Sequence, residues 1–138
     1  MFNLGGIYDY LYQAKSEGFE ELRRFFSFRS VKYYFLAFGL ANLLAWLEVY
    51  YMNRQVIQDY IVLHYNVDLG VSLLGGAKQL YVIPFLGLIF FLANALISLR
   101  FTRQDNFYFL SNLLLGSALL AQFFLLCGIA ALYLVNFQ

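Results

Sequence analysis

Long apolar stretches alternate with short polar segments along the chain. The apolar stretches cover residues 33–52, 80–100 and 107–136, and each is long enough to cross a hydrocarbon core, which takes about 20 helical residues. None alternates between polar and apolar positions as a barrel strand does, and backbone groups in lipid must be bonded within their own segment. The third stretch has no charged or turn-forming break, so we expect one long helix there. The pattern predicts an all-α integral membrane protein with three transmembrane helices.

The segment before the first span, residues 6–30, has the periodicity of an amphipathic helix. Charged residues, among them Glu17, Glu21 and Arg24, fall largely on one side. The other side carries apolar and aromatic residues: Ile7, Tyr8, Leu11, Tyr12, Phe19, Leu22 and Phe26. Because its charges are mixed rather than basic, we expect this helix to lie in the membrane interface and cover the ends of the spans. Lipid sensing or partner docking is the alternative.

Basic residues near the spans predict the orientation of the protein in the membrane. One side has them in short flanks: Arg23, Arg24, Arg29, Lys32, Arg100 and Arg103. The loop between the first two spans, residues 53–79, is much longer and has only Arg54 and Lys78. We therefore expect a multi-pass protein of the cell (inner) membrane, with a cytoplasmic amino terminus and an extracytoplasmic loop and carboxyl terminus.

The composition supports a membrane location and argues against nucleic-acid binding. Hydrophobic residues make up 62% of the 138 residues and charged residues only 12%, which is too few for a soluble domain of this length. The net charge is +1 and basic residues are interspersed with acidic ones, so the chain offers no basic face to nucleic acid. We expect residues 1–138 to form a single membrane domain with the lipid bilayer as its main partner.

The first span combines small residues with a carboxylate. Ala37, Ala41 and Ala45 recur every fourth residue, and Glu48 follows on the same side. Small residues at this spacing let a second helix approach closely, so we expect this ridge to be the packing face and to direct Glu48 inward. A charge in hydrocarbon is costly, which makes Glu48 a candidate for function. Its position near the outer boundary also allows a structural role.

Polar residues of the spans fall at matching depths when residues are counted from the cytoplasmic flanks. Glu48, Pro84 and Gln122 share one level. Pro84 leaves a carbonyl of the preceding turn without its helical donor, and the Gln122 amide can donate to that carbonyl or to Glu48. Asn94 and Asn112 share a second level, where a hairpin of the last two spans would bring their amides together. We interpret both groups as interhelical adhesion; a transport pathway, which would need an oligomer, is the alternative.

The loop between the first two spans contains the only histidine of the chain. Residues 60–65 are rich in β-branched and aromatic side chains, and Asn66, Asp68 and Gly70 supply turn chemistry, so we expect a short extended segment that ends in a turn. His64 has no second histidine, cysteine or serine at a motif spacing. We therefore interpret His64 as part of a turn docked on the bundle, and expect no metal, cofactor or catalytic residue.

The same loop resembles a known bacterial domain. The order is a span, the sequence LHYN at residues 63–66, Gly70, Lys78 and a span that begins near Pro84. This order is similar to that of a membrane domain of unknown function with a His-aromatic-Asn, glycine, aspartate and lysine loop, found in small multi-spanning proteins. Some of these are immunity or signalling proteins for secreted toxic peptides. The chain departs from the pattern at Ser72, where an aspartate is expected, and looks more like uncharacterised short bacterial proteins with an LHYN loop. The resemblance implies a bacterial inner membrane and an outward loop.

These observations leave two functional hypotheses. In the first, the chain is a non-enzymatic membrane protein whose outer loop is a structural cap or a recognition surface for a membrane protein or peptide. The loop residues are His64, Tyr65, Asn66, Gly70 and Lys78. In the second, the chain is a subunit of a homo-oligomeric transporter or channel, and its polar residues are Glu48, Pro84, Asn94, Asn112 and Gln122. A membrane enzyme is disfavoured because no nucleophile, base and orienting residue can be assembled.

Overall fold

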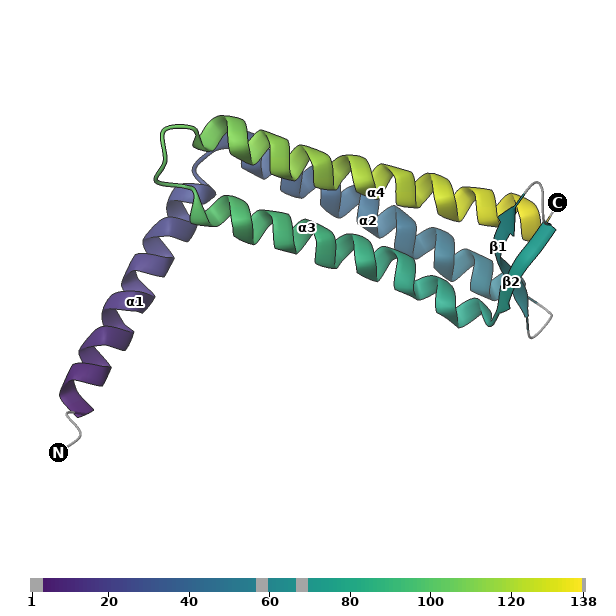
Figure 1. Cartoon of the computed structure of the whole chain (residues 1–138), viewed down its shortest axis with the longest axis horizontal. Helices are drawn as coiled ribbons and strands as arrows, with labels where there is room; N and C mark the ends of the chain where they lie inside the picture. The colour runs from purple at the N-terminus through teal and green to yellow at the C-terminus, as the bar shows by residue number, and fades with distance from the viewer. Residues whose placement is uncertain (1–3, 57–59, 67–69, 138) are drawn as a thin grey trace.

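A bundle of long helices forms the body of the protein. The computed structural model describes residues 4–56, 60–66 and 70–137, with the backbone alone for residues 4–14, 64–66 and 70–72. Helices α2 (Arg29–Gln55), α3 (Val82–Arg100) and α4 (Phe107–Phe137) lie side by side, with α1 (Leu4–Phe25) at one end of the bundle (Figure 1). We call this the α1 end.

The opposite end of the bundle carries a β-hairpin, and we call it the hairpin end. Strand β1 (Ile61–Asn66) pairs with β2 (Gly70–Gly75) in antiparallel orientation. The short helix η1 (Ala77–Tyr81) then leads directly into α3. The extended segment expected at residues 60–65 is therefore present. The second strand was not expected, because its sequence GVSLLG starts and ends with glycine, a residue that is depleted in strands.

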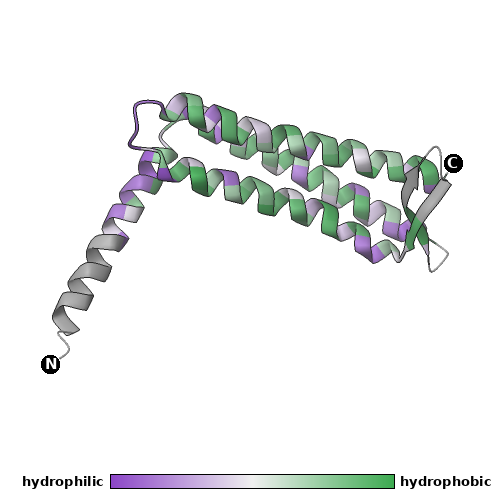
Figure 2. Ribbon diagram, viewed as in Figure 1, coloured by the Kyte–Doolittle hydropathy of each residue, from purple (hydrophilic) through white to green (hydrophobic). Residues whose placement is uncertain are grey.

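Among the described residues, three helices are long and apolar enough to cross a membrane, which confirms the predicted fold class. They are Arg29–Gln55, Ala77–Arg100 and Phe107–Phe137. Helix α4 is continuous over 31 residues and about 46 Å long at 1.5 Å per residue, which is longer than a perpendicular span requires. Apolar residues cover the bundle along its length, while hydrophilic residues gather in the described part of α1 and the connection between α3 and α4 (Figure 2).

Helix α1 joins the bundle through its last turn. Phe25 is buried and makes edge-to-face contacts with the rings of Phe26, Phe35 and Phe107. The predicted helix at residues 6–30 is interrupted after Phe25, and Arg29 already belongs to α2. Figure 1 shows the rest of α1 leaving the bundle at an angle. Its interfacial location stays a prediction.

The described residues form two buried apolar clusters along the bundle. The cluster at the α1 end contains Phe25, Val31, Phe38, Phe91, Ala95, Phe107, Leu115 and Ala118, with Phe38 and Phe91 stacked at 3.9 Å between ring centroids. The cluster at the hairpin end contains Ala45, Val49, Met52, Ile61, Leu80 and Ile129. Because Ile61 comes from β1, the hairpin closes the second cluster.

The packing face of α2 differs from the predicted alanine ridge. Its buried residues follow a spacing of mostly three and four: Val31, Phe38, Asn42, Ala45, Val49 and Met52. Of the three alanines only Ala45 is fully buried, while Ala37 and Ala41 are half-buried on the flank of this face. The larger side chains of Phe38 and Met52 fill the space between helices, so close helix approach at an alanine ridge is not the main packing mode.

Candidate functional site

Asn42 of α2 is the centre of a buried polar layer between the two apolar clusters. Its Nδ2 donates to the carbonyl oxygen of Pro84 in α3 at 2.9 Å and, over a longer 3.4 Å, to Oε1 of Gln122 in α4. Its Oδ1 accepts a hydrogen bond from Nε1 of Trp46 at 3.0 Å. One amide therefore connects all three spans, and the indole of Trp46 in turn stacks on Tyr81.

The predicted layer is right for Pro84 and Gln122 but wrong for Glu48, whose place Asn42 takes. Counting for the first span started at Tyr33, whereas α2 begins at Arg29. Asn42 lies 13 residues after that start, close to the 15 residues between Gln122 and the start of α4. Asn42 was missed because the charged flank of the first span was placed outside the helix.

Gln122 is almost completely buried and only partly bonded. Its Oε1 lies so close to Gly87 of α3 that a Cβ atom at position 87 would overlap it. Its Nε2 is buried and has no hydrogen-bond partner among the described residues. A buried donor without a partner costs about 1–3 kcal/mol, so this layer is polar but incompletely satisfied.

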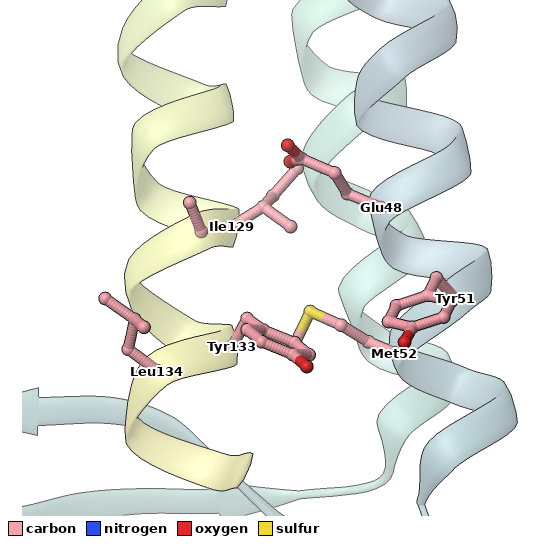
Figure 3. A pocket seen from close by; sticks show the side chains of 7 residues that line it. Glu48, Tyr51, Met52, Ile129, Tyr133 and Leu134 are labelled. Atoms are coloured by element: carbon pink, nitrogen blue, oxygen red, sulfur yellow. The ribbon is translucent and has the colours of Figure 1, made fainter. Parts of the chain in front are cut away.

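Glu48 lines a separate groove between α2 and α4, nearer the hairpin end. The groove has a volume of about 390 Å³ and is lined by Glu48, Tyr51, Met52, Ile129, Ala130, Tyr133 and Leu134. Figure 3 shows the Glu48 side chain directed into the space between the helices, with Tyr133 and Met52 on its hairpin side. The carboxylate therefore points into the protein, as expected, but at the level of Ile129 rather than of Gln122.

The two amides predicted at a second level are not joined to each other. Nδ2 of Asn94 donates to the carbonyl of Phe90 in its own helix at 2.9 Å. Asn112 is half-buried, because α4 turns Ser111 rather than Asn112 towards the interior. No hydrogen bond links Asn94 to Asn112 in the described part of the chain. A side-chain amide in a helix can bond to its own backbone one turn earlier, and this local bond replaces the predicted one between helices.

Two asparagines that were not predicted attach other segments to the hairpin end of the bundle: Asn136 holds β1, and Asn53 holds η1. Asn136, in the last turn of α4, accepts a hydrogen bond from the N–H of Val62 at 2.7 Å and donates to the carbonyl of Val62 at 2.9 Å. Asn53 of α2 donates to the carbonyls of Val49 and Ala77 at 3.0 and 3.1 Å. The sequence feature that could have indicated these contacts is an asparagine near the end of an otherwise apolar helix, which occurs in both α2 and α4.

Four of the five predicted loop residues, His64, Tyr65, Asn66 and Gly70, belong to the strands of the hairpin. His64 is opposite Leu73, and Asn66 is opposite Gly70, with irregular register on both sides of His64. Lys78 lies in η1 and is exposed. Residues 67–69 and the side chains of residues 64–66 and 70–72 are outside the described part, so the predicted turn and a docked His64 imidazole stay predictions. Elsewhere in the described residues, no group of three His, Cys, Asp or Glu side chains could hold a metal ion.

Comparison with protein-family models, with curated proteins and with solved structures finds no match to this chain. The resemblance of the LHYN loop to a bacterial membrane domain therefore stays a prediction from residues 63–66, Gly70 and Lys78.

Proposed function

We propose that this chain is a non-enzymatic integral membrane protein that recognises an extended segment of a partner protein or peptide through the free edge of its hairpin. In the orientation expected from the basic flanks, this edge lies on the extracytoplasmic side. The observation that supports the proposal is a difference between the two strands: β1 is fixed to the bundle and β2 is open.

Strand β1 acts as the cap. Ile61 is only 5% exposed and packs in the cluster at the hairpin end. Both backbone groups of Val62 are bonded to the side-chain amide of Asn136, which pairs with β1 as a neighbouring strand would. The edge of β1 is therefore blocked at this residue and is not open to a partner.

Strand β2 exposes the complementary edge. Leu74 is opposite Val62, and the N–H and C=O of Val62 point to Asn136 rather than to β2. In an antiparallel pair such residues form a non-hydrogen-bonded pair, so the N–H and C=O of Leu74 point away from β1. The side chains of Leu73 and Leu74 are 54% and 59% exposed.

An open strand edge beside exposed apolar side chains is the structure that binds extended peptides by strand addition. The added strand gains main-chain hydrogen bonds at Leu74, and its side chains cover the two leucines. Because Asn136 holds β1 in place, the edge is fixed before the partner arrives, which lowers the entropic cost of binding.

Site-specific photocrosslinking in native membranes tests this function. A photoreactive phenylalanine analogue at Leu73 should give a discrete protein or peptide adduct, and the same analogue at the exposed Leu36 of α2 should give none. A further variant combines the analogue at Leu73 with Leu74→Pro, which removes the outward N–H while leaving the pairing of β1 and β2 intact. This variant should form no adduct and should be as thermally stable as the protein without Leu74→Pro.

The outcomes separate recognition from a purely structural cap. Adducts with lipid alone at position 73 would show that the exposed leucines contact the bilayer surface. A protein adduct that persists in the Leu74→Pro variant would exclude strand addition. Either result overturns the proposed function.

A further inference from the structure

The groove that holds Glu48 has the size of a small-molecule site. Its volume of about 390 Å³ falls in the range of about 300–1,000 Å³ that is typical of ligand pockets. It lies between α2 and α4 and is separate from the free edge of the hairpin. The proposed recognition of a peptide makes no use of it.

The carboxylate in this groove has no counter-charge within the described part of the chain. Oε2 of Glu48 is buried without a hydrogen-bond partner. The nearest basic residue along α2, Arg54, is exposed and bonds through its guanidinium to the hydroxyl of Tyr50 at 2.8 and 3.0 Å. An ionised carboxylate removed from water is costly unless it is paired. The groove therefore favours a cation that comes from outside the chain.

The rest of the lining suits a cation with an apolar body. The rings of Tyr51 and Tyr133 lie 6.2 Å apart between centroids, and aromatic faces attract cations. Met52, Ile129, Ala130 and Leu134 supply apolar walls. Figure 3 shows the aromatic rings on the hairpin side of the carboxylate, so charged and apolar surfaces are adjacent within one groove.

We propose that this groove binds a hydrophobic organic cation taken up from the membrane, with its charged centre at the Glu48 carboxylate and its apolar body between α2 and α4. A zwitterionic lipid headgroup fits less well, because the seven lining residues include no lysine or arginine to meet a phosphate. A transition metal fits less well too, because Glu48 is the only carboxylate, histidine or cysteine in the lining.

Binding of tetraphenylphosphonium to the purified full-length protein in lipid nanodiscs tests the inference. Equilibrium dialysis should show saturable binding of about one cation per chain. Glu48→Gln should weaken the binding by more than about tenfold, because it removes one partner of a desolvated charge pair. Glu21→Gln is the matched control: it removes a carboxylate at the α1 end that is paired with Arg103 at 3.1 Å, and should leave the binding unchanged.

Two further measurements test the inference even if the Glu48→Gln protein does not fold. Ala130 is exposed on α4 and lines the groove, so Ala130→Phe should fill the groove and reduce binding while the carboxylate remains. Tetraphenylborate has the same shape as the probe and the opposite charge, and its partitioning should not depend on Glu48. Absence of saturable cation binding, or equal affinity in wild-type, Glu48→Gln and Ala130→Phe proteins, would overturn the inference.

Discussion

Replacement of Asn42 tests the polar layer that connects the three spans. Asn42→Leu keeps a side chain of similar size but removes the hydrogen bonds to Pro84, Gln122 and Trp46. A hydrogen bond between membrane helices contributes about 0.6 kcal/mol on average. Loss of the two bonds between helices and of the bond to Trp46 within α2 should therefore lower the free energy of unfolding by about 1–2 kcal/mol, and by more if Gln122 keeps no partner in its buried position.

The single tryptophan of the chain provides the assay. Trp46 donates its indole N–H to Asn42, so its fluorescence should report both loss of the hydrogen bond in the folded state and unfolding during an SDS titration in bicelles. Asn112→Leu is the matched control, because Asn112 is half-buried in α4 and lies outside the layer. It should change the free energy of unfolding by less than about 0.5 kcal/mol.

A double-mutant cycle separates the bond to Gln122 from the other contacts of Asn42. Replacing both partners of a buried hydrogen bond with apolar groups can be nearly neutral, whereas replacing one leaves the other unsatisfied. Asn42→Leu combined with Gln122→Leu should therefore be less destabilising than the sum of the single changes, by about 0.5–1.5 kcal/mol. Additive effects, or an Asn42→Leu protein as stable as wild type, would refute the role given to this layer.

Three further predictions concern the hairpin and the topology. Asn136→Ala should release β1 and accelerate amide hydrogen exchange in this strand by about tenfold or more, as measured by mass spectrometry. Gly75→Ala should lower stability by less than about 1 kcal/mol, because the added Cβ overlaps only the ends of the Gln79 and Leu63 side chains, which can move aside, whereas Gly76→Ala, with open space around the Cβ, should leave the melting temperature unchanged. In a background without the native cysteine, an impermeant thiol reagent outside the cell should label a cysteine at Leu73 and not one at the exposed Gln104; the reverse pattern would invert the orientation.

The membrane spans could be predicted from the sequence because one constraint determines them. A helix that crosses lipid must stay apolar over a fixed length, so a long apolar run locates it without knowledge of its neighbours. The continuous helix α4 follows from the same reasoning, since residues 107–136 contain no charged residue. The ends of the helices are predicted less well: α2 begins at Arg29 rather than at Tyr33, and this shift of four residues accounts for most of the six residues that separate Asn42 from the predicted Glu48.

The polar contacts depend on pairings between distant segments, and these could not be predicted. Asn136 bonds to Val62, 74 residues earlier in the chain, and nothing in the local sequence of α4 indicates a strand at its end. The same holds for β2, whose strand conformation depends on pairing with β1 rather than on the intrinsic preference of GVSLLG. The predicted bond between Asn94 and Asn112 failed for the opposite reason, because Asn94 found an acceptor within its own helix.

Polar side chains are scarce in this bundle, and what each one contacts indicates its role. Three buried side-chain atoms lack a hydrogen-bond partner within the described residues: Oε2 of Glu48, Nε2 of Gln122 and Oγ of Ser98. Gln122 is held by Asn42 through its other amide atom, and Ser98 is neutral and enclosed in the core of α3. Glu48 differs from both, because it can carry a full charge and borders a groove large enough for a ligand. A carboxylate in a mostly apolar groove is therefore better explained by a cation that it binds than by the packing of α2 against α4.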